Sequence, residues 1–415
     1  MSEQPQPQSG EEKPENIYLV STAGNPNFGD EYITAAWLRF LAKQRPDAEV
    51  WLDCPQPGNA SFLFEGLHPR LKVTNMLWRV SWETIDLDPD EGDATVDRLV
   101  NELGTPLYDY GLVKARRATA VHLIGGGHIT ANWEHHGRLV RAARRLAEIS
   151  GAQLFATGLG LMPPIYPEKL RDDLAAFDHA TVRDQPSAEA VGVEMVCDDA
   201  FLDLPNLAGF GERTGPTATE KGEIWLDIQR DLATEETFDA AIEAVRAYLE
   251  SPEAEGRTIR YLEAIPGGDR IAFDRLKDLI GEESFVPFLD LWDGGFPARP
   301  RQTWITTRFH YHLLAAGCGA EGVAVEVNDD YYRTKHQSLI DQGTGWSVAA
   351  AGSPELPAPA TNVEFRLTAG RLHKAKLEEA ERLYPRKAPP RPAAATPAPE
   401  PARRPEPKRG GLFRR

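Results

Sequence analysis

Short apolar runs alternate with stretches of helical periodicity in two successive blocks, and this pattern limits the fold of the chain more than any other feature. Alternation of this kind indicates parallel strands joined by crossover helices. We therefore predict an α/β fold with two Rossmann-like doubly wound domains facing a central cleft, where the strand ends of such sheets bind ligands. The apolar runs of the first block are NIYLVST, AEVWL, AVHLIGG and AQLFATG, and those of the second are GEIWLDIQ, RTIRYLEAI, TWITT and GVAVEV.

A chain of 415 residues is too long for one ordinary core. The segment LAGFGERTGPTATEKG is rich in Gly, Thr and charge, and it marks the predicted boundary between the domains. The predicted parts are a disordered N-terminal extension (1–15), an N-terminal Rossmann-like domain (16–206), a linker (207–221), a C-terminal Rossmann-like domain (222–350), a C-terminal helical segment (351–385) and a disordered, Pro-rich basic tail (386–415).

The composition, 41% hydrophobic and 26% charged, is typical of a globular protein. No stretch approaches the roughly 20 apolar residues needed to span a membrane, and the polar N-terminus lacks the apolar segment of a secretory signal. Cys54, Cys197 and Cys318 lie far apart, without the spacing that holds zinc. We expect reduced, mostly buried cysteines, no metal site and a cytoplasmic location.

The net charge of −17 is unevenly distributed. Residues 386–415 carry nine Lys and Arg against Glu400 and Glu406, so the rest of the chain is more acidic than the total indicates. An acidic body without a recognisable binding motif argues against nucleic acid as a partner. The tail ends in KRGGLFRR, a pattern that suggests weak peripheral contact with the inner face of a membrane. Attraction to the acidic body, or a solubilising role without a partner, explains the tail more simply.

The loop AGNPNFGDEYI follows the first predicted strand and leads into a helix. Gly29 permits a tight turn, and the acid Asp30 suits the dipole at a helix N-terminus. Asn27 and Asp30 could equally position the hydroxyl groups of a substrate, and the sequence leaves both interpretations open.

Glycines follow two further predicted strands. Gly125, Gly126 and Gly127 remove every side chain at a strand-to-helix turn, so backbone N–H groups can approach an anion or a sugar. Gly158 and Gly160, in ATGLGLMPP, repeat the arrangement. One glycine turn alone is compatible with simple packing, whereas two favour the wall of a ligand cleft.

The segment TTRFHYH places Arg308 close to His310 after an apolar strand. If the chain leaves the sheet in an extended conformation, these two side chains project to the same side. A guanidinium can hold a carboxylate or phosphate with two hydrogen bonds, and an imidazole can transfer protons near neutral pH. A structural network at the strand end is the alternative, and we assign His312 to the core. Arg183 likewise pairs with Asp184 or binds an anion.

The ordered motifs of the chain resemble those of the polysaccharide pyruvyl transferase family. That resemblance implies a GT-B-like fold, no cofactor, a phosphoenolpyruvate donor and a saccharide or lipid-linked glycan acceptor for cell-envelope polysaccharide. Arg308 and His310 fall on the family's Arg-x-His motif, Arg183 on its other characteristic arginine, and Lys335 on a basic position beyond the next strand. The motifs are GNPNFGDE, LIGGG, TGLGLMPP, VRDQPSAEAVG, DDAFLDLP and TTRFHYHLLAAGCG…VAVEVNDDYYRTKHQSL.

The sequence departs from the family pattern in three places: the inserted NPN, the Tyr311 and His312 that follow the Arg-x-His motif, and CGAEG in place of a proline-containing turn. These departures affect the expected acceptor more than the donor. A GT-B glycosyltransferase with a nucleotide-sugar donor and a catalytically silent sugar-binding protein are the alternative functions.

Overall fold

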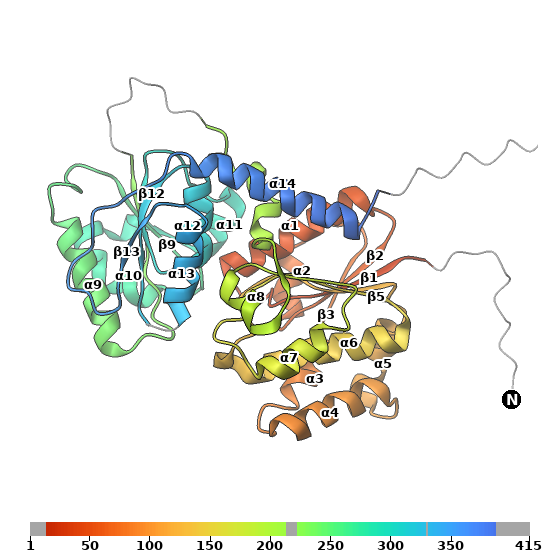
Figure 1. The fold of residues 1–415 in the computed structure, drawn as a ribbon. Coiled ribbons are helices and arrows are strands. Elements are labelled where there is room, and N and C mark those ends of the chain that lie inside the picture. The colour runs from red at the N-terminus through yellow and green to blue at the C-terminus, as the bar shows by residue number, and fades with distance from the viewer. Residues whose placement is uncertain (1–13, 213–221, 329–330, 387–415) are drawn as a thin grey trace, which may run out of the picture.

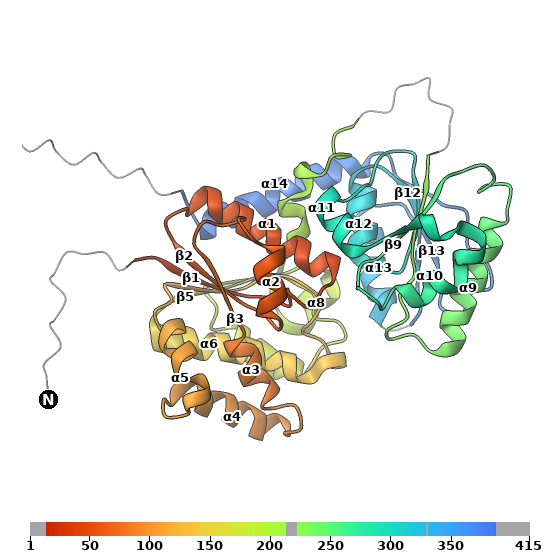
Figure 2. The same cartoon turned by 180° about the vertical axis from the view of Figure 1, so that it is seen from behind.

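The computed structural model describes residues 14–212, 222–328 and 331–386, which form two α/β domains side by side (Figures 1 and 2). Each domain contains one parallel sheet. The order is β3-β2-β1-β4-β5-β6-β7 in the N-terminal domain and β10-β9-β8-β11-β12-β13 in the C-terminal domain. The strands are β1 (Asn16–Val20), β2 (Glu49–Asp53), β3 (Leu71–Thr74), β4 (Ala120–Leu123), β5 (Gln153–Leu159), β6 (His179–Val182), β7 (Glu194–Met195), β8 (Ile224–Asp227), β9 (Ile259–Leu262), β10 (Phe285–Val286), β11 (Thr303–Thr306), β12 (Glu321–Val325) and β13 (Ser347–Ala349).

Helices connect these strands and continue beyond the last one. The α-helices are α1 (Phe28–Gln44), α2 (Pro57–Leu63), α3 (Met76–Trp82), α4 (Pro89–Asn101), α5 (Pro106–Ala115), α6 (Arg138–Ser150), α7 (Pro167–Leu174), α8 (Gln185–Val191), α9 (Glu235–Leu249), α10 (Arg270–Ile280), α11 (Phe288–Gly294), α12 (Phe309–Gly317), α13 (Tyr331–Asp341) and α14 (Phe365–Leu383). Short 3-10 helices are η1 (Ala131–Gly137), η2 (Asp199–Leu202), η3 (Leu204–Asn206) and η4 (Glu282–Ser284).

The predicted pair of doubly wound parallel sheets is confirmed. The central strands β1, β4, β8 and β11 are buried along their whole length, as continuous apolar runs predict for strands covered on both faces. In each sheet the strand order reverses between neighbouring central strands, β1 and β4 in one and β8 and β11 in the other. Loops at the carboxyl ends of these strands are therefore where a ligand site is expected.

Aromatic side chains join the two domains next to those loops. Phe28, at the start of α1, packs against Trp292, Phe296 and Tyr311 of the C-terminal domain, with ring centroids 5.4–6.2 Å apart. Its backbone N–H also donates to the carbonyl of Ala264, 3.1 Å away. A single apolar cluster consequently extends through both domains.

Helix α14 returns from the C-terminal domain and lies across the N-terminal domain (Figures 1 and 2). Just beyond it, the Tyr384 hydroxyl is 3.1 Å from His122 Nδ1 on β4. Lys376 is completely buried, with Nζ 2.8 Å from Asp199 Oδ1 and 2.6 Å from Glu379 Oε2. Against burial, which lowers it, the two carboxylates raise the pKa of Lys376. The chain end is thus tied into the domain where the chain begins.

Several expectations concern regions that the structure covers only partly. Most of the predicted extension, part of the linker and nearly all of the basic tail lie outside the described residues. Cys54, Cys197 and Cys318 are buried and form no disulfide, which confirms the expectation of reduced, buried cysteines. No helix of the described ranges is long and apolar enough to cross a membrane.

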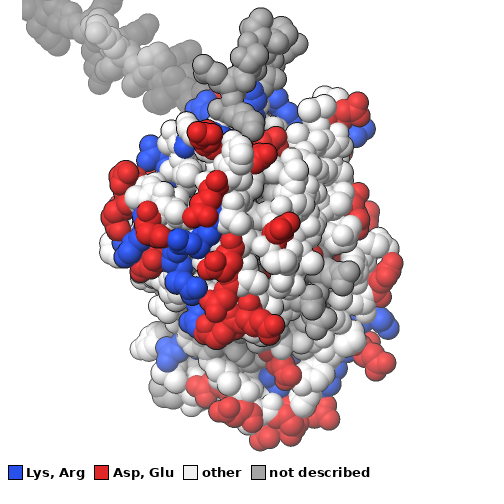
Figure 3. Space-filling model, turned by 90° about the vertical axis from the view of Figure 1, so that its left-hand side faces the viewer, with Lys and Arg blue, Asp and Glu red and all other residues white. Residues whose placement is uncertain are grey.

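Basic and acidic side chains alternate on the exposed surface of the C-terminal domain. Helices α9 and α10 exchange ion pairs, with Arg246 2.7 Å from Asp278 and Arg275 2.9 Å from Asp239. Figure 3 shows basic side chains lying among acidic ones on this side of the molecule. Such exposed pairs contribute little to stability, so the buried network at Lys376 matters more.

We predict that Lys376→Met destabilises the N-terminal domain by about 3–5 kcal/mol, because it leaves the Asp199 and Glu379 carboxylates buried without their cation. Urea unfolding followed by circular dichroism measures the change. Lys374→Met on the same helix is the control, since its side chain is 77% exposed and it should alter stability by less than about 0.5 kcal/mol. Equal stability of the two variants would contradict the prediction.

Candidate active site

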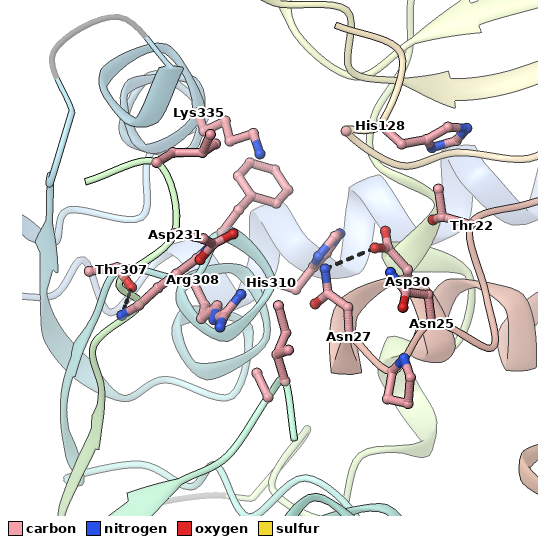
Figure 4. A pocket seen from close by; sticks show the side chains of 18 of the residues that line it. Thr22, Asn25, Asn27, Asp30, His128, Asp231, Thr307, Arg308, His310 and Lys335 are labelled. Carbon is pink, nitrogen blue, oxygen red and sulfur yellow. Dashed lines mark hydrogen bonds between the residues drawn. The ribbon is translucent and has the colours of Figure 1, made fainter. Parts of the chain in front are cut away.

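A cavity of about 360 Å³ lies between the domains, at the carboxyl ends of both sheets. Loops from both sheets supply its walls, and Figure 4 shows their side chains facing one another across the cleft. Eight of the predicted site residues line it: Asn27, Gly29, Asp30, Gly127, Arg183, Arg308, His310 and Lys335. Residues that are far apart in the sequence thus meet in one place.

Arg308 is the N-cap residue of α12, and 7% of its surface is exposed. Its Nε donates to Asp227 Oδ1 at 3.2 Å, and its Nη2 donates to Asp269 Oδ1. Burial and the neighbouring Asp269 carboxylate raise the pKa of Asp227 well above its usual range, against the effect of Arg308. Two carboxyl groups thus hold the Arg308 guanidinium in place at the wall of the cavity.

His310 lies in the first turn of α12, so the predicted extended exit from the strand is wrong: the helix begins at Phe309. Both Arg308 and His310 nevertheless reach the same cavity. His310 Nε2 is 3.4 Å from Asp198 Oδ1 of the N-terminal domain. A Cβ on Gly29 would lie only 1.9 Å from His310 Nδ1, so this position in α1 has room for glycine alone.

Arg183 follows β6 and is 3% exposed. Its Nη1 donates to Asp198 Oδ2 at 3.0 Å, and its guanidinium lies 4.1 Å from the centre of the Phe309 ring. It also approaches Asp184, with Nε 3.6 Å from Oδ2. Both proposed surroundings of Arg183, an acidic partner and a ligand cavity, are therefore present together.

Asp198 connects Arg183 of one domain with His310 of the other. Burial alone would raise the pKa of Asp198, but His310 and Arg183 hold it well below its usual range. Lys335 reaches toward the same region from α13: a Cβ on Gly127 would lie 3.0 Å from Arg183 Nη2 and 3.3 Å from Lys335 Nζ. Four cationic or protonatable side chains thus gather at this end of the cavity.

Asp30 occupies the first turn of α1, as the loop sequence predicts. Asn27 Nδ2 donates to its Oδ2 at 2.9 Å. Burial raises the pKa of Asp30, while His310 and Lys335 lower it. Figure 4 shows His310 between Arg308 and Asp30.

Four predicted site glycines, Gly125, Gly126, Gly158 and Gly160, are not among the residues that line the cavity. A Cβ on Gly125 or Gly158 would lie 2.9 or 2.5 Å from the Asp199 carboxylate group, and one on Gly160 would lie 2.4 Å from Arg183 Nε. These glycines make room for buried charged side chains. The strand-then-glycine pattern thus located the loops at the cleft, but of its five glycines only Gly127 lines the cavity.

Sequence reasoning missed several side chains of this site. Asp198 begins the DDAFLDLP motif after a short strand, a position that could have been singled out. Asp227 ends an apolar strand, whereas Asp269 follows PGG without any local signal. Five further missed residues line the N-terminal side of the cavity: Thr22, Asn25, Pro26, Trp133 and His136. His128 directly follows the three glycines, a position that suits either a helix start or a sugar contact, and it lines the cavity with them.

His312 is fully buried, as expected for a core residue. Its Nδ1 is 3.2 Å from His336 Nδ1, and its Nε2 is 2.9 Å from the Thr344 hydroxyl. His312 therefore supports α13, which carries Lys335, rather than lining the cavity.

Comparison with known families identifies the chain. A sequence model described as polysaccharide pyruvyl transferase matches residues 27–329, which include both sheets except for β1 and β13. The chain belongs to the polysaccharide pyruvyl transferase family. The predicted family and the predicted transferase class are thereby confirmed. The matched range holds Arg183, Arg308 and His310 and ends before Lys335.

Solved structures share the architecture of this pyruvyl transferase family member at low sequence identity. A protein of Listeria monocytogenes described as a UDP-N-acetylglucosamine 2-epimerase superposes with a TM-score of 0.51 at 13% identity, covering 90% of this chain and 93% of its own. The UDP-GlcNAc 2-epimerase of Methanocaldococcus jannaschii, in complex with UDP-GlcNAc and UDP, gives 0.50 at 12%, covering 89% and 98%. These similarities confirm the GT-B-like fold alone. A search of curated proteins found no match.

We predict that His128 stays uncharged in this pyruvyl transferase family member. Burial lowers its pKa to about 3, whereas unfolded histidine has a pKa of about 6.5. Between these two pKa values only the unfolded state binds a proton at His128. The free energy of unfolding therefore decreases as the pH falls. Between about pH 6 and pH 4 the wild type should lose about 1.4 kcal/mol per pH unit more than His128→Gln in urea unfolding. Above about pH 7 the difference should be constant, and a difference independent of pH throughout would contradict the prediction.

Proposed function

We propose that this enzyme transfers a pyruvyl group from phosphoenolpyruvate to two hydroxyl groups of a saccharide, forming a pyruvate ketal on a polysaccharide or glycan precursor. The observation that carries the proposal is the convergence of Arg183, Arg308, His310 and Lys335 on one interdomain cavity. Family membership supports the pyruvyl group as the transferred unit.

The two arginines of the cavity suit the donor. Phosphoenolpyruvate carries a carboxylate and a phosphate, and arginine binds either group with charge-assisted hydrogen bonds. Asp227 and Asp269 fix the orientation of Arg308, and Asp198 does the same for Arg183. Fixed cations need little reorganisation when an anion binds, which favours both affinity and catalysis.

The reaction requires two carbon–oxygen bonds to form and one to break. An acid protonates C3 of the enol phosphate, the first hydroxyl attacks C2, and the C2–O bond to phosphate breaks. The second hydroxyl then closes the ring on C2. The two hydroxyl groups release two protons. One of them balances the proton that turns C3 into a methyl group, and the other leaves with inorganic phosphate. Atoms and charges balance without an oxidant or reductant.

His310 is placed to move these protons. It lies between Arg308 and Asp30 (Figure 4). Its Nε2 is 3.4 Å from Oδ1 of Asp198, whose pKa is held well below its usual range. An imidazole can donate and accept protons near neutral pH, so we assign His310 as the acid toward C3. Asp30, whose pKa is raised by burial, is the neighbouring group that can accept a proton from an attacking hydroxyl.

The alternative donor is a nucleotide sugar, because the solved structures of similar fold include enzymes described with UDP-sugars. Thermal stabilisation of the purified protein by phosphoenolpyruvate, compared with a panel of nucleotide sugars, separates the two functions. Stabilisation by nucleotide sugars alone would refute the proposal, and stabilisation by neither class would favour a protein without transferase activity.

We predict that Arg308→Lys raises the Kd for phosphoenolpyruvate roughly tenfold or more, because lysine keeps the charge and loses the two-pronged contact. Isothermal titration calorimetry measures this constant. Arg275→Lys on the exposed face of α10 is the control and should bind as the wild type does. If Arg308→Lys unfolds instead, the pairs with Asp227 and Asp269 show that its role is structural.

We predict that His310→Ala retains donor binding and lowers kcat by about 100- to 10,000-fold, as expected for loss of a general acid–base residue. Release of phosphate from phosphoenolpyruvate in the presence of a saccharide acceptor measures turnover. Wild-type kcat in this variant would remove His310 from the mechanism, whereas loss of donor binding would make it a binding residue.

A further inference from the structure

We propose that residues 408–415 dock, within their own chain, into a second cavity between the two domains. This cavity measures about 430 Å³ and is lined by residues of both domains. Residues 387–415 lie outside the described part of the chain, so the docked segment is characterised by its sequence alone, KRGGLFRR. The docking site does not depend on the donor or the acceptor proposed above.

An aromatic cluster separates this second cavity from the active site. Phe28, Tyr32 and Phe296 line the second cavity, and each is at most 6% exposed. Tyr311 lines the active-site cavity, and its ring centroid is 5.6 Å from that of Phe28 and 5.2 Å from that of Phe296. A segment docked in the second cavity therefore contacts side chains that hold the two domains together.

Exposed apolar side chains lie on the two helices at the edge of this cavity. Trp292 of α11 donates from Nε1 to the carbonyl of Leu63 of α2 at 3.3 Å, and both residues line the cavity. On the same two helices, Phe62 is 81% exposed and Leu289 is 62% exposed. Large apolar side chains that stay exposed beside a largely apolar cavity mark an interaction surface.

The cavity also has a buried donor that lacks an acceptor. Within the described part of the chain, the Tyr32 hydroxyl is buried and has no hydrogen-bond partner. Burial and the nearby Asp203 carboxylate raise the pKa of Tyr32 well above its usual range, so the hydroxyl keeps its proton. Buried polar groups nearly always have partners. The backbone carbonyl of a docked peptide supplies the missing acceptor, whereas a purely apolar ligand does not.

The charge at the edge of the cavity selects a basic partner. Glu65, Asp290 and Asp293 are exposed next to lining residues, and none of them forms an ion pair within the described ranges. The lining residue Arg39 is already paired with Asp203, at 2.6 Å. A second copy of this face would bring the same carboxylates together, and an anionic membrane would also meet them with like charge.

The segment KRGGLFRR has the complementary chemistry. Leu412 and Phe413 form an apolar pair that suits an aromatic cavity, and four basic side chains flank this pair. Exposed ion pairs contribute little affinity by themselves. The apolar pair therefore supplies most of the binding, and the basic residues select the acidic edge. Because the segment belongs to the same chain, its effective concentration at the cavity is high.

The segment can reach the cavity from the end of the described chain. The Tyr384 ring, just beyond α14, is 6.2 Å from the Trp37 ring of α1. Phe28 and Tyr32 of the same helix line the cavity, and the 17 residues of α1 measure about 25 Å along the helix axis. The 28 residues from Tyr384 to Leu412 span up to about 85 Å when extended, which is enough even for a path around α1.

Photo-crosslinking of the full-length protein tests the docking site, with p-benzoylphenylalanine in place of Phe413 and the crosslinks mapped by mass spectrometry. We expect crosslinks within one chain to the residues that line the cavity. The double variant Phe62→Ser, Leu289→Ser should lower their yield about tenfold, and Asp290→Asn with Asp293→Asn should lower it several-fold. Tyr32→Phe should also lower the yield several-fold, because it removes the donor.

The matched control is Leu107→Ser with Tyr110→Ser on α5, a second pair of exposed apolar side chains, at 53% and 89% exposure, which should keep the wild-type yield. Circular dichroism shows whether each variant has folded, and the acidic pair is fully exposed if the apolar pair does not tolerate change. Crosslinks to other surfaces only, or only between two chains, would overturn the proposal. So would capture of lipid in place of the cavity when phosphatidylglycerol vesicles are added, or an unchanged yield in the apolar and acidic variants.

Discussion

One buried carboxylate organises the N-terminal domain, and the candidate active site depends on it. The Asp199 side chain accepts hydrogen bonds from Trp37 Nε1 at 2.7 Å, Gly125 N at 2.8 Å, Thr157 Oγ1 at 2.7 Å and Lys376 Nζ at 2.8 Å. These donors belong to α1, to the loop that contains Gly125, Gly126 and Gly127, to β5 and to α14. A charge that is buried so completely is tolerated only because every oxygen is satisfied and a cation is adjacent.

The same turn of the chain carries the interdomain contact. Asp198 precedes Asp199 directly, and it binds Arg183 within its own domain and approaches His310 of the other. The backbone that Asp199 anchors therefore sets the position of Asp198, and with it one of the contacts between the two domains at the cavity. Helix α14 contributes to the site through Lys376, although none of the residues that line the cavity belongs to this helix.

The sequence predicted the parts of this structure that depend on local pattern. Continuous apolar runs identified the buried strands, and glycines after strands identified the loops at the cleft. It could not show that Gly158 accommodates Asp199, because that contact joins strand β5 to a turn about forty residues later. The partners of Arg308 are similarly remote: Asp227 lies 81 positions away and Asp269 lies 39. Contacts of this kind follow from topology, which fixes them only after both sheets have formed.

The surroundings of Asp198 and Asp30, two carboxyl groups close to His310, shift their pKa values in opposite directions. This difference assigns different roles in proton transfer to the two groups. Arg183 and His310 keep Asp198 ionised, whereas burial raises the pKa of Asp30. Neighbouring titratable groups whose pKa values are pushed apart are typical of acid–base catalysis. Asp198 thus places a negative charge 3.4 Å from His310 Nε2, whereas Asp30 is the neighbouring carboxyl group that holds a proton more readily. In the proposed reaction, Asp30 would accept the proton of the attacking hydroxyl and His310 would give a proton to C3 of phosphoenolpyruvate, which is the direction that ketal formation requires.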